Sequence, residues 1–233
     1  MRSHVRQAVA IIGGTGAEGS GLALRFAKAG LRVVIGSRNP ERAEAAARNI
    51  ASQAGAGEVT GYVNPDAVSK AAIVILTVPL SAQIETLKSI RTNFGSGAIL
   101  VDATVPLEIA IGGRVSRTVT LWDGSAAQQA SRLAPEGVPV VAAFHGLSAE
   151  ALARLDQPVD SDTLICGDNP EAKAAVSELA RTIPGVRAID AGPLENARFL
   201  ESSAALLIAL NLRHKVKHSG LRITGLGPGE VHP

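Results

Sequence analysis

Aromatic side chains are scarce in this sequence. Its 233 residues include four Phe, one Tyr and one Trp, so few rings are available to stack on the bases of a single-stranded nucleic acid. The chain also lacks a marked excess of either charge, because it has 23 Lys and Arg and 21 Asp and Glu, and its formal net charge is +2. A chain with this balance has no overall field that attracts a polyanion. We therefore expect no nucleic-acid partner.

Cysteine and long apolar runs are also lacking. Cys166 is the only cysteine and cannot form an internal disulfide; in its apolar strand we expect it to be buried and inert. The longest apolar stretches, residues 71–79 and 204–212, fall short of the roughly 18 residues that a membrane span needs. The first residues lack the apolar core of a signal peptide. These absences predict a cytoplasmic protein without membrane contact.

Metal-ligand spacing is absent from the five histidines. His214 and His218 lie four residues apart, but no third ligand is near them in the sequence, and a metal site needs three or four ligands. We expect no metal site.

Strand and helix patterns alternate along most of the chain. Residues 8–12 form an apolar run, residues 17–29 repeat apolar side chains at helical spacing, and residues 31–35 form a second β-rich run. Runs that are apolar on both faces are typical of a parallel sheet covered by helices on both sides. We predict an α/β fold with a doubly wound parallel Rossmann sheet and a small C-terminal α/β domain.

The pattern changes after about residue 155, and we predict two domains, an NADP-binding Rossmann domain over residues 1–155 and a small domain over residues 156–233. The second contains a long apolar helix, residues 194–212, followed by a basic tail that begins at Arg213. The helix is apolar on much of its circumference at Leu206, Leu207, Ile208 and Leu210, which predicts burial on several sides and a homodimer.

The segment Gly14-Thr15-Gly16-Ala17-Glu18-Gly19 matches the dinucleotide-binding fingerprint. It directly follows the first predicted strand and opens the first predicted helix, where backbone amides and the helix dipole bind a pyrophosphate. Gly14 permits the turn, Gly16 leaves room for the pyrophosphate, and Gly19 allows close packing of helix and strand; Thr15 and Ala17 supply amides. A purely structural glycine turn is the alternative.

The end of the second predicted strand favours NADP over NAD. An NAD-specific fold carries an acidic residue there, but this chain has Ser37 and Arg38, with Arg42 one helical turn further on. Each charge-assisted contact with a 2′-phosphate contributes roughly 1.5–3 kcal/mol, so two such contacts favour NADP a hundredfold or more. The alternative is that Asn39 and Pro40 cap a helix while Ser37 and Arg38 are solvated.

Together these features resemble the NADPH-dependent coenzyme F420 reductases (F420H2:NADP oxidoreductases). The resemblance covers almost the entire chain. It depends on residues 12–23 (IGGTGAEGSGLA), 36–38 (GSR), 76–79 (LTVP), 166–168 (CGD) and 190–194 (DAGPL).

The resemblance implies roles for particular residues. Thr15 through Glu18 are expected to hold the pyrophosphate, and Ser37, Arg38 and Arg42 the 2′-phosphate. Further positions are implied for the adenosine or nicotinamide path (Leu80, Ile84, Val105 and Ala149), for the deazaflavin ring (His145 and Leu147) and for a contact near the C-terminus (Leu221). Leu80, Asp102 and Gly146 depart from the family pattern, which implies a wider acceptor pocket.

The implied activity is hydride transfer between NADP(H) and the deazaflavin coenzyme F420, both small-molecule substrates. The cofactors carry the electronic chemistry and the protein supplies orientation, so we expect no obligate catalytic acid or base. His145 is either a hydrogen-bond donor to the deazaflavin or a structural histidine. Lys215, Lys217 and Arg222 either meet the acidic tail of F420 or form a solvated face.

Two other functions remain open at this stage. One is an NADPH-dependent imine or carbonyl reductase of the same fold, for which the sequence offers no clear proton donor apart from His145. The other is a non-catalytic domain that binds NADPH as a redox sensor.

Overall fold

The computed structural model describes residues 8–226; the outer ends of the two predicted domains, residues 1–7 and 227–233, lie outside the described residues. The strands are β1 (Val9–Ile12), β2 (Arg32–Ser37), β3 (Glu58–Val63), β4 (Ile73–Leu76), β5 (Ile99–Asp102), β6 (Val140–Ala142), β7 (Asp162–Gly167) and β8 (Arg187–Asp190). The α-helices are α1 (Ala17–Lys28), α2 (Pro40–Ala54), α3 (Asn64–Ser69), α4 (Leu80–Ile90), α5 (Ala126–Leu133), α6 (Ala149–Ala153), α7 (Pro170–Arg181) and α8 (Ala197–His214). Short 3₁₀ helices are η2 (Arg91–Asn93), η3 (Glu108–Ile111) and η4 (Leu194–Asn196).

One sheet runs through the molecule in the strand order β3-β2-β1-β4-β5-β6-β7-β8. Neighbouring strands from β3 to β6 are parallel, β7 pairs antiparallel with β6, and β8 is parallel to β7. The strand order reverses between β1 and β4, and ligands of doubly wound sheets bind at the carboxyl ends of strands beside such a point. The predicted α/β Rossmann class is confirmed.

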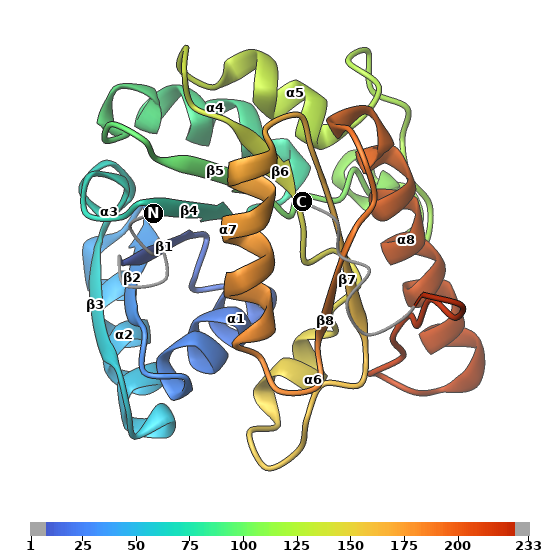
Figure 1. Ribbon diagram of the computed structural model, residues 1–233, viewed down its shortest axis with the longest axis horizontal. Helices are drawn as coiled ribbons and strands as arrows, with labels where there is room; N and C mark the ends of the chain where they lie inside the picture. The colour runs from blue at the N-terminus through green and yellow to red at the C-terminus, as the bar shows by residue number, and fades with distance from the viewer. Residues whose placement is uncertain (1–7, 227–233) are drawn as a thin grey trace.

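Helices cover both faces of this sheet. One core cluster packs α1, α2, α6 and α7 against side chains such as Val9 and Ile11, and the other packs α3, α4, α5 and α8 against Ala10 and Ile12. Figure 1 shows α4 and α5 along the top, α3 at the left edge level with β4, and α1, α2 and α6 in the lower half. Because successive side chains of a strand point to opposite faces, the continuous apolar run of β1 serves both cores.

The predicted boundary at residues 155 and 156 falls in the connection between α6 and β7. The antiparallel pairing of Ala142 with Cys166 and of Val141 with Gly167 joins the two predicted domains in one sheet, so the division stays a prediction. Cys166 is fully buried, as expected, and burial is the main cause that raises the pKa of its thiol to about 12.

The long helix α8 differs from its prediction. Leu207 is buried, but Leu206 and Leu212 are 59% and 62% exposed, because α8 packs on the sheet and α5 along one side. Phe199, from the first turn of the same helix, is 57% exposed. Among the described residues, no helix is both long and apolar enough to cross a membrane.

Candidate active site

The loop between β1 and α1 lies against the end of β4. Gly13 has φ +88°, and a Cβ there would lie 2.9 Å from the carbonyl oxygen of Thr77, so this position requires glycine. A Cβ at Gly19 would lie 2.6 Å from Thr77 Oγ1 and 2.8 Å from the Cα atom of Gly14. These close approaches hold the first turn of α1 at the carboxyl edge of the sheet. No side chain caps that turn, which leaves amide donors for an anion.

A first hollow opens beside this loop, with a volume of ≈ 340 Å³; we call it the phosphate-end hollow. Its wall contains the predicted residues Thr15, Gly16, Ser37, Arg38 and Arg42. Among the described residues neither arginine is in an ion pair with a carboxylate. The remaining wall residues, which sequence reasoning missed, are Gly13, Asn39, Asn64, Thr77, Val78, Pro79, Ala82 and Thr86.

Helix capping and an arginine-lined wall occur together in this hollow. Asn39 Oδ1 accepts a hydrogen bond of 2.8 Å from the amide of Arg42, and the Asn39 amide donates to Ser37 Oγ over 3.2 Å. The cap therefore fixes the start of α2, and α2 in turn holds Arg42 one turn from Arg38. The two interpretations of this segment do not exclude each other.

A second and larger hollow, of ≈ 590 Å³, shares Gly16, Thr77, Val78 and Pro79 with the first; we call it the nicotinamide-end hollow. Six predicted site residues besides Gly16 line it: Ala17 and Glu18 of α1, Val105 after β5, His145 and Leu147 after β6, and Ala149, the first residue of α6. Gly146 and Lys217, which the sequence also singled out, line it as well. The missed wall residues come from segments far away in the sequence and include Ala103, Leu107, Ile109, Ser148, Glu150, Ala204, Leu207, Ile208, Asn211 and Ser219.

His145 lies in a strained turn at the end of β6. Phe144, its neighbour, has φ +73°, a left-handed conformation that is rare for a bulky residue and is common at functional sites. Phe144 stays in place because its ring packs edge-on against Phe26 and its amide donates to Thr163 Oγ1 over 3.0 Å.

The imidazole of His145 is only 7% exposed, and neither ring nitrogen has a hydrogen-bond partner among the described residues. Burial lowers the pKa of this ring to about 4, with a smaller opposing effect of the Thr104 backbone. His145 is therefore neutral near pH 7. The ring is thus a neutral, buried imidazole in the wall of the nicotinamide-end hollow.

Five predicted residues are not in the wall of either hollow: Gly14, Gly19, Leu80, Ile84 and Leu221. Leu80 and Ile84 share one side of α4, whereas Ala82 and Thr86 face the phosphate-end hollow from another side; a two-residue offset in a helix turns a side chain by about 200°. The backbone of Leu221 pairs with Asp162 and Ser161. Lys217 and Ser219 of the same segment line the nicotinamide-end hollow instead.

Buried carboxyl groups lie behind the nicotinamide-end hollow. Asp102 is fully buried at the end of β5, where it accepts hydrogen bonds from Gln83 Nε2 (2.7 Å) and the Thr104 amide (2.8 Å). Glu201 of α8 accepts from the amides of Ala126 and Ala127 at the start of α5. Burial raises the pKa of Asp102 to about 7 and that of Glu201 to about 8. This network fixes the turn that leads to Val105.

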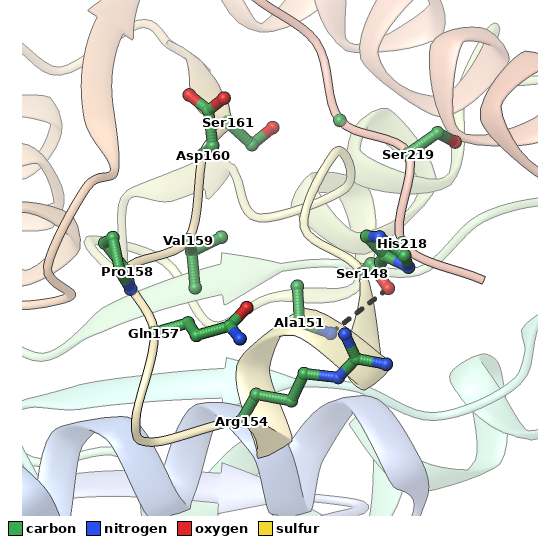
Figure 2. Close-up of a pocket in the computed structure, with 11 residues that line it drawn as sticks. Ser148, Ala151, Arg154, Gln157, Pro158, Val159, Asp160, Ser161, His218 and Ser219 are labelled. Carbon is green, nitrogen blue, oxygen red and sulfur yellow. Dashed lines mark hydrogen bonds between the residues drawn. The ribbon is translucent and has the colours of Figure 1, made fainter. Parts of the chain in front are cut away.

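The C-terminal segment divides the nicotinamide-end hollow from a smaller one, of ≈ 140 Å³ (Figure 2). Ser148 and Ser219 line both. Arg222 holds the segment in place by ion pairs with Asp160 and with Asp162. Arg222 is therefore engaged elsewhere, and of the predicted basic cluster only Lys217 lines the nicotinamide-end hollow.

The sequence of this chain is similar to those of known reductases. Residues 8–106 match the family model described as NADP oxidoreductase coenzyme F420-dependent. The F420-dependent NADP reductase of Methanothermobacter thermautotrophicus is 49% identical over 221 residues, which cover 94% of this chain and 95% of the relative. The chain belongs to the F420-dependent NADP reductase family. The family's reductase from Methanocaldococcus jannaschii is 43% identical over 222 residues, 94% of this chain and 98% of the relative.

Solved structures share the fold of this chain. A chain from Arthrobacter sp. FB24 superposes with a TM-score of 0.77 at 24% identity, over 94% of this chain and 99% of that one. A reductive aminase from Aspergillus terreus superposes with a TM-score of 0.59 at 17% identity, over 91% of this chain and 63% of that one. At these identities the likeness concerns the Rossmann-type fold alone.

Proposed function

We propose that this member of the F420-dependent NADP reductase family transfers a hydride between NADP(H) and coenzyme F420. The observation that carries the proposal is the pair of hollows that meet at Gly16 and Thr77, at the carboxyl ends of β1 and β4. One hollow offers two arginines for a phosphate. The other is wide and mostly apolar, with few polar groups, as expected of a site that orients two flat rings. The nicotinamide and deazaflavin rings supply the redox chemistry.

We assign the NADP-binding residues as the sequence predicts. The first turn of α1, with Gly14 and Gly19 as its close-packed glycines, binds the pyrophosphate through the amides of Thr15, Gly16, Ala17 and Glu18. Ser37, Arg38 and Arg42 bind the 2′-phosphate. The uncapped helix terminus and the arginines that are in no ion pair support both assignments.

We assign the deazaflavin end of the site to residues of the nicotinamide-end hollow. Leu147 provides an apolar or backbone contact to the deazaflavin and His145 offers a hydrogen bond, while Val105 and Ala149 line the path of the nicotinamide beside it. The place of His145 in the wall of that hollow supports its role. Leu80, Ile84 and Leu221 stay predictions from the resemblance, at the edges of the site.

A spectroscopic assay tests the proposed activity. Mixing the protein with NADPH and F420 is expected to bleach the visible absorbance of the deazaflavin, because hydride addition interrupts its conjugated ring system. Tight NADPH binding without bleaching would contradict the proposal and favour the redox sensor. Oxidation of NADPH by an imine or carbonyl compound, with no reaction of F420, would favour the alternative reductase.

We also infer a cytoplasmic homodimer. The exposed apolar side chains of α8, namely Phe199, Leu206, Leu210 and Leu212, support the dimer, because a monomer rarely exposes so many large apolar groups on one helix. Light scattering on the wild type and on Leu206→Glu tests it, since a charge in the interface is expected to yield monomers. A monomeric wild type would contradict the inference.

A further inference from the structure

A buried arginine joins α1 to α6. Arg25, in the last turn of α1, is only 3% exposed, and among the described residues it has no carboxylate partner within ion-pair distance. Its Nε donates to the carbonyl oxygen of Leu152 over 2.8 Å. Its Nη2 lies within hydrogen-bond distance of three further carbonyl oxygens, those of Ala151 (2.7 Å), Gln157 (3.0 Å) and Arg154. The buried charge is thus paired with the backbone of one segment, residues 151–157.

These carbonyl groups lie in and just after a helix that is too short to be stable alone. Helix α6 has five residues, and isolated helices of this length do not persist in water. The carbonyl groups at the end of a helix also lack partners within it. A guanidinium group has five N–H donors in one plane and no acceptor, so it can satisfy several carbonyl groups together. Arg25 therefore supplies the hydrogen bonds that the end of α6 lacks.

Close packing reinforces the same contact. Gly21 lies one helical turn before Arg25, and a Cβ there would lie 2.8 Å from the Cβ atom of Leu152, so α6 is nearer to α1 than a side chain at this position permits. Residues 18, 21 and 25 share one face of α1 because they are three and four positions apart. Glu18 of this face lines the nicotinamide-end hollow. The contact between the two helices therefore adjoins the ligand-binding end of α1.

Helix α6 and the turn before it form one side of the nicotinamide-end hollow. Leu147 and Ser148 of the turn line this hollow, and so do Ala149 and Glu150 of the helix. Ser148 Oγ donates to the carbonyl oxygen of Lys217 over 2.8 Å, and Lys217 lines the hollow from the C-terminal segment. A chain of contacts thus runs from α1 through α6 to the C-terminal segment. The position of α6 determines the width of the hollow on this side.

We propose that Arg25 is a positioning residue for the deazaflavin, which holds α6, and with it Leu147 and Ser148, at a fixed distance from the helix that binds the nucleotide. This inference rests on the proposed function, because it requires F420 in the nicotinamide-end hollow. Arg25 lines neither hollow, so it acts through α6 and not by contact with a ligand. No residue of α6 lines the phosphate-end hollow, and the grip on the nucleotide phosphates is therefore independent of Arg25.

Steady-state kinetics with NADPH and F420 test the inference. The variant Arg25→Lys keeps the positive charge but loses the planar fork that reaches several carbonyl groups. The KM for F420 is expected to rise about tenfold, because a small displacement of a binding wall misplaces the bound ring. The KM for NADPH is expected to change less than about twofold, because charge-assisted contacts at its phosphates anchor it. A merely structural role would lower the melting temperature and the apparent kcat, with both KM values unchanged.

A second variant perturbs the same contact from the other partner. Gly21→Ala retains Arg25 but displaces α6 from α1, because its Cβ meets Leu152; it decides the question if Arg25→Lys does not fold. It is expected to raise the KM for F420 and to leave that for NADPH nearly unchanged. Lys28→Ala, which removes an exposed cation from the last turn of the same helix, is the matched control and is expected to change neither.

The outcomes separate this inference from the proposed function. If the wild type bleaches F420 and the folded variants keep its KM for F420, the inference is overturned and the proposed function stands. An equal rise of both KM values would also overturn it, because the effect would then come from α1 itself. A wild type that binds NADPH but does not react with F420 would overturn the proposed function and this inference with it.

Discussion

The two ends of the cleft are built in different ways. The phosphate-end hollow takes most of its wall from residues 13–42, one continuous strand-helix-strand-helix segment, with additions from α3 and the start of α4. The nicotinamide-end hollow combines α1 with the loops after β4, β5 and β6, with α6, with α8 and with the C-terminal segment. A local motif thus supplies just over half of the wall of one hollow, whereas packing of distant segments forms the wall of the other.

The largest loss of nucleotide affinity is expected from substitutions at the phosphate end. Replacing both Arg38 and Arg42 by Ala is expected to weaken NADP binding a hundredfold or more, because two charge-assisted contacts of roughly 1.5–3 kcal/mol each are lost. NAD binding is expected to change far less. Titration of both nucleotides measures the effect. Arg48→Ala, which removes an exposed arginine of α2 outside the hollow, is the control, and an equal loss for NAD and NADP would contradict the assignment.

At the ring end a smaller effect is expected from His145. The variant His145→Ala is expected to raise the KM for F420 about tenfold, the value of one buried hydrogen bond of about 1.4 kcal/mol. The Kd of NADPH is expected to change less than twofold, and kcat to fall only slightly. Steady-state kinetics and NADPH titration separate these quantities. A loss of kcat of a thousandfold with unchanged KM would show that His145 acts in the chemical step instead.

The smallest expected effect concerns Glu201, a buried carboxyl group of α8. Glu201 has a pKa raised from 4.5 to about 8, with burial as the main cause, so its protonated form favours the folded state and this contribution is lost as pH rises from about 4.5 to 8. The free energy of unfolding of the wild type, relative to Glu201→Gln, is expected to fall by up to about 1.4 kcal/mol per pH unit in this range. Denaturant titrations at pH 5 to 8 measure it. A difference that is independent of pH would contradict the buried, titrating state.

At the phosphate end the sequence indicates the glycine turn and the two arginines of the wall, because these signals are local. Glycine spacing fixes the turn before α1, and the absence of an acidic residue after β2 indicates the 2′-phosphate site. Asn64 and Thr86 were missed because they reach this hollow from α3 and α4, and no sequence spacing indicates that approach. The first two strands, β1 and β2, lie within two residues of the runs 8–12 and 31–35 that predicted them, since both are compact apolar runs.

The ring end is less predictable for a physical reason. Whether Ala204 or Leu207 of α8 lines the hollow depends on how that helix packs on the sheet, which its apolar pattern does not indicate. Helix α6 has only five residues, too few for a periodic signal. The strain at Phe144 leaves no trace in the sequence. His145 and Val105 were found only because the chain resembles a known family.

The most direct test is a crystal structure of the protein with NADP⁺ and F420 bound together. The account predicts the 2′-phosphate between Arg38 and Arg42, and nicotinamide C4 about 3–3.5 Å from the reacting carbon of the deazaflavin, the separation of a near-attack geometry, inside the hollow lined by Val105 and His145. A deazaflavin bound outside that hollow, or a nicotinamide ring that points away from it, would contradict the account.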